Sequence, residues 1–184
     1  MSCFPRECER GRRLGTRPVV GALRDDGRVG ISPDELIGYV ERAVDQMAGI
    51  ITALGDDLAN SRPALPGANS PYVILRHCLG VMEFWGGQVV AGRVVQRDRD
   101  AEFRASGPVA ALVAGAQEAK ETFRADVATA DPTAPPRGTH PGMDRDELET
   151  RSQGSALLHV LEEVTQHLGQ MELTRDVLRD GRLR

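Results

Sequence analysis

The chain has 184 residues, 40% of them hydrophobic and only 4% aromatic, so it can form one domain whose interior is filled mainly by Leu, Val, Ala and Met. Its net charge of −4 argues against nucleic acid as a partner, and no apolar run approaches the length that would cross a membrane. The three cysteines, an odd number, form no disulfide framework and favour a reducing, cytoplasmic location.

The first 30 residues show no helical periodicity and contain seven arginines, four acidic residues and two prolines. No apolar core of signal-peptide length follows the basic residues. We therefore predict a disordered leader over residues 1–30 and a single folded domain over residues 31–184.

The first predicted helix begins with a capping box, in which Ser32 is the cap, Pro33 takes the first helical position and Glu35 stands three residues after the cap. Apolar residues then recur at steps of three and four residues as far as about Asn60. Residues 61–69 contain two prolines and a glycine, which predicts a loop.

The second predicted helix begins in the same way, with Ser70 as cap and Pro71 at the first position, and runs to about Gly92. On a helical wheel, four apolar residues fall within about 60° of His77: Val73, Ile74, Val81 and Phe84. His77 is therefore expected at the centre of the buried face, either as a hydrogen-bonded core residue or as a metal ligand. Cys78 is expected to be a small core residue and not a thiolate ligand.

A polar, arginine-rich connection covers residues 93–107, and a third helix is predicted from about Pro108 to Ala130. We expect the charged residues of this helix, including Lys120, to form a solvated face. Residues 131–150 form a long loop rich in proline and glycine that contains His140. We expect His140 to be exposed, although a loop of this length can also act as a lid over a site.

The fourth predicted helix covers residues 155–181, where a core-facing stripe recurs at helical spacing: Leu157, Leu161, Val164, Leu168 and Met171. Glu163 and His167 are four residues apart on the same flank of this stripe, so their side chains can converge on one point. Glu162 is directed to solvent, and His159 lies one turn back and further round the helix. The pair Glu163 and His167 is either an ordinary polar pair at the edge of the core or two ligands of a divalent metal.

The four predicted helices, with no strand alternation and no repeat, indicate an all-α fold, a four-helix up-and-down bundle. The chain has only four histidines, and two of them, His77 at the centre of a buried face and His167 beside a core stripe, strengthen the metal interpretation.

Two sequence stretches resemble the DinB-like superfamily: L-R-H-C-L-G-V-M-E-F-W in the second helix and E-x-x-x-H-x-G-Q in the fourth. They are most similar to the metal-binding domain of mycothiol-dependent maleylpyruvate isomerase and related actinobacterial proteins, over roughly residues 32–182. The resemblance implies a divalent metal, zinc or alternatively nickel, held by His77, Glu163 and His167. His159 matches a related actinobacterial pattern, and its role is left open.

Three protein ligands leave an open coordination position on such a metal, where a thiolate could bind. The resemblance implies that this thiolate belongs to a low-molecular-weight thiol such as mycothiol, bacillithiol or glutathione. We therefore expect a metal-dependent S-transferase that joins a small thiol to an electrophile. The alternative is a non-catalytic metal-binding protein, for stress response or interaction. A homodimer is expected, because bundles of this family commonly pair and some Leu and Val surface is left to be covered.

Overall fold

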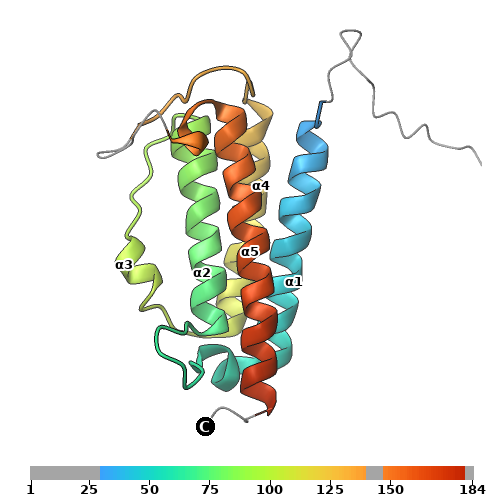
Figure 1. Ribbon diagram of the computed structural model, residues 1–184, viewed down its shortest axis with the longest axis vertical. Coiled ribbons are helices and arrows are strands. Elements are labelled where there is room, and N and C mark those ends of the chain that lie inside the picture. Colours follow the sequence, from blue (N-terminus) through green and yellow to red (C-terminus); the bar gives the residue numbers. More distant parts are fainter. Residues whose placement is uncertain (1–29, 140–146, 181–184) are drawn as a thin grey trace, which may run out of the picture. The chain divides into compact units, whose positions relative to one another are not determined.

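The computed structural model describes residues 30–139 and 147–180 (Figure 1). The compact unit that carries the helices begins at Ser32. The predicted leader, apart from Gly30, lies outside the described residues, as do His140 and the predicted helix cap Gly181. The division of the chain into a leader and one domain therefore remains a prediction.

The described residues contain helices and loops but no strand, which confirms the all-α prediction. Four long helical segments form the bundle, the second of them continuing from an α-helix into a wider π-helix. The elements are α1 (Pro33–Asn60), α2 (Pro71–Val81), η1 (Met82–Val90), α3 (Arg99–Glu102), α4 (Val109–Ala128), η2 (Leu148–Thr150) and α5 (Gln153–Asp180). No helix among the described residues is both long enough and apolar enough to span a membrane.

The order of helix directions differs from simple up-and-down alternation in one connection. The amide of Val109, at the start of α4, donates to Asp56 near the end of α1, at 2.8 Å, so α4 runs antiparallel to α1. Helix α2 also reverses the direction of α1, so α2 and α4 run parallel (Figure 1). The 18 residues between Val90 and Val109 are long enough to return along a helix of about 30 Å. This crossover segment, residues 91–108, includes α3.

Local signals start the first two long helices as expected. The amide of Glu35 donates to the Ser32 hydroxyl at 3.1 Å, and the amide of Ser32 donates to the Glu35 carboxylate at 2.8 Å, which completes the capping box. The Ser70 hydroxyl accepts from the amide of Val73 at 3.3 Å. Near its end α1 is kinked at Gly55, whose φ of 71° is a conformation that side-chain-bearing residues rarely adopt.

The core lies where the four long helices face one another. Fully buried side chains from α1 and α5, such as Met47, Ile51, Val164 and Met171, are 0% exposed. The expectation that the charged side of α4 is a solvated face is wrong at one position. Lys120 is only 7% exposed, and its Nζ lies 2.5 Å from a carboxylate oxygen of Asp45 on α1. Because Asp45 on α1 pairs with the ammonium group, burial of Lys120 costs less free energy than burial of an unpaired lysine would.

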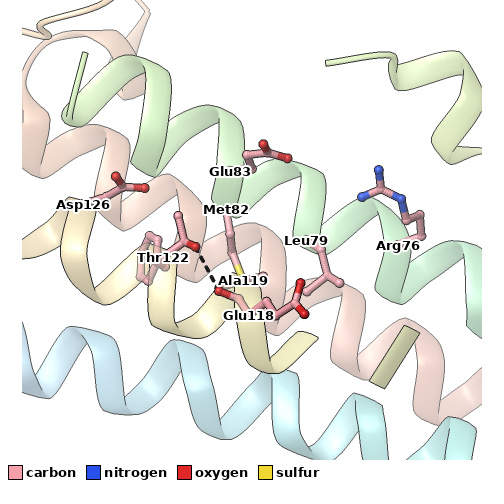
Figure 2. A pocket seen from close by; sticks show the side chains of 9 residues that line it. Arg76, Leu79, Met82, Glu83, Glu118, Ala119, Thr122 and Asp126 are labelled. Carbon is pink, nitrogen blue, oxygen red and sulfur yellow. Dashed lines mark hydrogen bonds between the residues drawn. The ribbon is translucent and has the colours of Figure 1, made fainter. Parts of the chain in front are cut away.

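A small pocket of about 220 Å³ lies between the α2–η1 helix and α4 (Figure 2). It carries several carboxylates, but Asp126 is already bound by the guanidinium of Arg93 through two hydrogen bonds of 2.8 Å. Glu118 contributes its backbone carbonyl to a hydrogen bond from the Thr122 hydroxyl, at 3.0 Å. These acidic residues are not among the described groups whose ligand atoms converge closely enough for a metal.

Candidate metal centre

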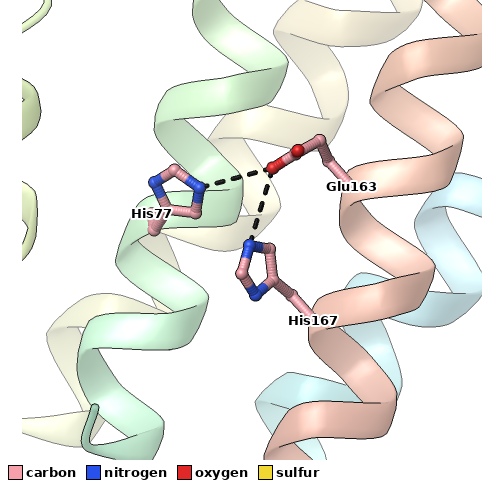
Figure 3. Close-up of side chains that lie close together, drawn as sticks. All are labelled: His77, Glu163 and His167. Atoms are coloured by element: carbon pink, nitrogen blue, oxygen red, sulfur yellow. Dashed lines mark ion pairs between the residues drawn. The ribbon is translucent and has the colours of Figure 1, made fainter. Parts of the chain in front are cut away.

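Three side chains from α2 and α5 converge at one point: His77, Glu163 and His167 (Figure 3). Each can offer one ligand atom, and these atoms all lie within 4.8 Å of one another. The Nε2 atoms of both histidines lie 3.5 Å from the same Glu163 oxygen, Oε2. The two imidazole rings meet edge to face, with centroids 4.9 Å apart. We call this set the triad; it is the only such group among the described residues.

Helical geometry explains why the triad contains Glu163 and not its neighbour. Val164 is 0% exposed and fixes which side of α5 faces the core. Glu163 and His167, one turn apart, then lie together at the edge of that side and face α2. The side chain of Glu162 is 61% exposed and makes a hydrogen bond with Gln166 at 3.2 Å. The predicted directions of the two adjacent glutamates agree with the structure.

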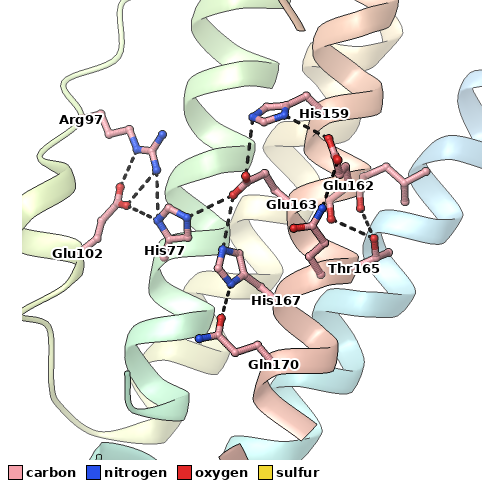
Figure 4. Close-up of polar contacts among 11 residues, drawn as sticks. His77, Arg97, Glu102, His159, Glu162, Glu163, Thr165, His167 and Gln170 are labelled. Atoms are coloured by element: carbon pink, nitrogen blue, oxygen red, sulfur yellow. Dashed lines mark hydrogen bonds and ion pairs between the residues drawn. The ribbon is translucent and has the colours of Figure 1, made fainter. Parts of the chain in front are cut away.

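The second nitrogen of His77 is held by a buried carboxylate from the crossover segment. His77 Nδ1 donates to Glu102 Oε2 at 3.0 Å, and Glu102 is only 2% exposed (Figure 4). Arg97 in turn donates to both oxygens of Glu102, at 2.8 and 3.0 Å. With Nδ1 engaged in this way, His77 faces the triad with Nε2, which donates to Glu163 when protonated and can offer its lone pair to a metal when deprotonated.

Close approach of Glu102 to His77 depends on a glycine in α2. A Cβ atom at Gly80 would lie 2.7 Å from Cδ of Glu102, far inside van der Waals contact. Arg97 and Glu102 lie in residues 93–107, for which the sequence predicted only a connection, so neither was predicted as part of the site. One signal was present, since a buried histidine needs an acceptor for one nitrogen and Glu102 is one of the few acidic residues in the connection.

His167 is oriented in a similar way from within its own helix. Its Nδ1 donates to the side-chain oxygen of Gln170 at 2.7 Å, which leaves Nε2 facing Glu163. Both histidines of the triad therefore have one nitrogen anchored and the other directed to a common point. This is the arrangement in which outer hydrogen bonds fix the ring orientation and tautomer of metal-binding histidines.

The ionisable groups of the site shift one another's pKa values toward the charged forms. Hydrogen bonds from His167 and His77 hold the pKa of the Glu163 carboxyl well below its ordinary value. The same contact with Glu163 raises the pKa of His167. Burial alone would raise the pKa of Glu102, but the hydrogen bonds from Arg97 and His77 outweigh it and lower that pKa. The carboxyl of Glu163 is thus ionised at neutral pH and can bind a cation.

A pocket of about 410 Å³ opens beside the triad and gives a small molecule access to it. Its lining combines aromatic, basic and triad side chains: His77, Val81, Phe84, Trp85, Arg97, Arg99, His159 and Glu163. The Nε2 atom of His159 lies 4.0 Å from Glu163 Oε1, and its ring lies 4.7 Å from that of Trp85. His159 thus lies beside the triad but is not one of its three convergent residues.

The described part of the chain has no accessible cysteine that could serve as a nucleophile. Cys78, adjacent to His77, is 0% exposed, as expected for a core residue. Burial in the core raises the pKa of its thiol, so it stays protonated and unreactive at neutral pH. Among the described residues, therefore, no side chain supplies a reactive thiol to this pocket.

Comparison with protein families matches residues 35–180 to the family described as Mycothiol-S-transferase. A search of curated proteins and a search of solved structures returned no match. The matched residues include both helices of the triad and the whole crossover segment. The chain therefore belongs to the mycothiol S-transferase family, a DinB-like family.

Proposed function

We propose that this protein is a metal-dependent S-transferase that joins a low-molecular-weight thiol of the mycothiol type to an electrophile. The metal ligands are His77, Glu163 and His167. The observation that carries the proposal is the convergence of these side chains beside an open pocket, in a member of the mycothiol S-transferase family.

The donor set fits a divalent cation. Two imidazole nitrogens and one carboxylate oxygen form a mixed set that suits zinc, and nickel is the alternative. Both imidazoles are oriented by partners outside the triad, Glu102 and Gln170. Three protein ligands are the number that leaves a coordination position for a substrate.

The chain's own side chains account for binding and orientation. A divalent cation at this site would lower the pKa of a thiol that binds to it, so that the thiol is held as a nucleophilic thiolate at neutral pH. Phe84 and Trp85 give the pocket an apolar wall that favours the body of an electrophile over water. In the transfer, the substrate sulfur attacks the electrophilic carbon, a C–S bond forms, and the leaving group departs with the bonding electron pair.

Matched alanine variants test the metal ligands. We expect His77→Ala, Glu163→Ala and His167→Ala each to lose most of the bound metal, because two ligands hold zinc far more weakly than three. Glu162→Ala removes the same atoms and charge one position away, from an exposed side chain, and should keep the metal. Metal content of the purified proteins is measured by elemental analysis. Circular dichroism checks folding, since the cavity left at position 77 alone costs about 1 to 3 kcal/mol.

Thiol consumption with simple electrophiles then tests the reaction. The parent and Glu162→Ala should consume thiol, and the three triad variants should not. Equal metal retention in the two glutamate variants would refute the assignment of the site. Stoichiometric metal without any thiol consumption would instead favour the non-catalytic alternative, in which the metal only ties α2 to α5.

A further inference from the structure

Two arginines of the crossover segment, Arg97 and Arg99, line the pocket beside the triad. Arg97 donates two hydrogen bonds to Glu102, and the negative charge of that carboxylate offsets the positive charge of the guanidinium. Arg99 is exposed and makes no ion pair with any described residue. Its guanidinium carbon lies 5.5 Å from the ring centroid of Phe103, which positions the group without neutralising it.

The acidic residues near Arg99 do not line the pocket. Asp98 and Asp100 flank it in the chain, and the Asp98 carboxylate accepts a hydrogen bond from the amide of Ala101 at 2.8 Å. The one carboxylate in the lining is Glu163, which faces His77 and His167. Arg99 therefore places a positive charge at the pocket, and its guanidinium donates no hydrogen bond to any described residue.

Apolar and aromatic side chains also line the pocket: Val81, Phe84 and Trp85. A ligand that contacts both these side chains and Arg99 has an apolar body and an anionic group. The planar fork of a guanidinium matches a carboxylate with two parallel hydrogen bonds. We propose that Arg99 recognises a carboxylate on the electrophile, so that the substrate class is organic acids with an apolar or aromatic body. This inference rests on the proposed S-transferase function.

Trp85 provides a direct readout of binding, because it is the single tryptophan of the chain and lines the pocket. The probes are two unreactive compounds with the same aromatic body, 3-phenylpropionate and its neutral amide. Each is titrated into the full-length protein while Trp85 fluorescence is followed, first with zinc present and again after chelation. The variants are Arg99→Gln and the matched control Arg104→Gln, which removes another exposed arginine of the same segment outside the pocket lining.

We expect the parent to bind the acid about tenfold more tightly than the amide, the scale of one charge-assisted contact at a partly solvated site. Arg99→Gln should remove that preference and leave amide binding unchanged, while Arg104→Gln should keep the preference. Equal affinities for acid and amide in the parent would overturn the inference. So would equal behaviour of the two variants, which would mean that the carboxylate binds the metal or responds only to overall charge.

These outcomes are separable from those that test the proposed function. Loss of the acid preference at Arg99 with thiol consumption retained toward a neutral electrophile supports both proposals. Thiol consumption without any acid preference refutes only the role of Arg99. An acid preference that depends on Arg99, without thiol consumption toward any electrophile, refutes only the S-transferase.

Discussion

Gly80, which leaves room for Glu102 beside His77, gives the sharpest single perturbation of the proposed metal site. In Gly80→Ala, a methyl group occupies the space that Glu102 fills beside His77. No ligand of the triad is changed, and neither is any charge. The carboxylate of Glu102 cannot move without breaking its bonds to Arg97 and His77, both of which hold it inside the protein. We expect Glu102 to be displaced and the ring of His77 to lose its anchor.

The expected magnitude follows from the contacts that are lost. Loss of an outer hydrogen-bond partner of a metal-binding histidine typically lowers metal affinity about 10- to 100-fold. That range corresponds to about 1.4 to 2.7 kcal/mol in binding free energy. Alanine also favours a helix over glycine by about 0.5 to 1 kcal/mol, so the effect of the clash on thermal stability is partly offset. Metal affinity therefore reports the displacement more clearly than the melting temperature does.

The assay is competition for zinc against a chelator of known affinity, with Gly115→Ala as control. Gly115 lies inside α4, and a Cβ atom there would meet nothing within 4 Å. The control should bind zinc like the parent and be slightly more stable. If Gly80→Ala is correctly folded by circular dichroism and binds zinc as tightly as Gly115→Ala, the expectation is refuted. Glu102 would then have no part in orienting His77.

Three further predictions concern the site and the whole chain. Because Glu163 raises the pKa of His167, protonation of His167 competes with metal binding. Zinc affinity should therefore fall as the pH is lowered from about 8 to about 5, and a flat profile in the chelator assay would contradict this. Removal of residues 1–29 should leave melting temperature and metal content unchanged, whereas a loss of several degrees would show that the leader packs on the domain. A homodimer is expected by light scattering at micromolar concentration, since large apolar side chains such as Tyr39 and Leu173 are 54% and 71% exposed; a monomer mass would refute it.

Much of the fold follows from signals that are local in the chain. The capping box at Ser32 and Glu35 and the Ser70-Pro71 start satisfy helix ends within a few residues, so they can be read without knowledge of the fold. The direction of Glu163 and His167 follows from helical periodicity alone, because Val164 defines the buried side of α5. The all-α bundle could be predicted for the same reason.

Other features were decided only by tertiary packing. The crossover between α2 and α4 brings Glu102 and Arg97 to His77, across 25 and 20 residues of sequence. No local pattern indicates that contact, since it depends on which way the connection returns along the bundle. Lys120 is likewise buried only because α1 presents Asp45 to it.

The sequence by itself therefore determined the four long helices and the faces they bury, and its family resemblance predicted His77, Glu163 and His167 as one set of metal ligands. Only the tertiary structure decided how closely these side chains converge and which groups orient them. The physical reason is that helix caps and periodicity are set by hydrogen bonds and side-chain directions within one or two turns. A site shared between helices depends on the relative placement of elements far apart in the chain, and that placement is set by packing of the whole core.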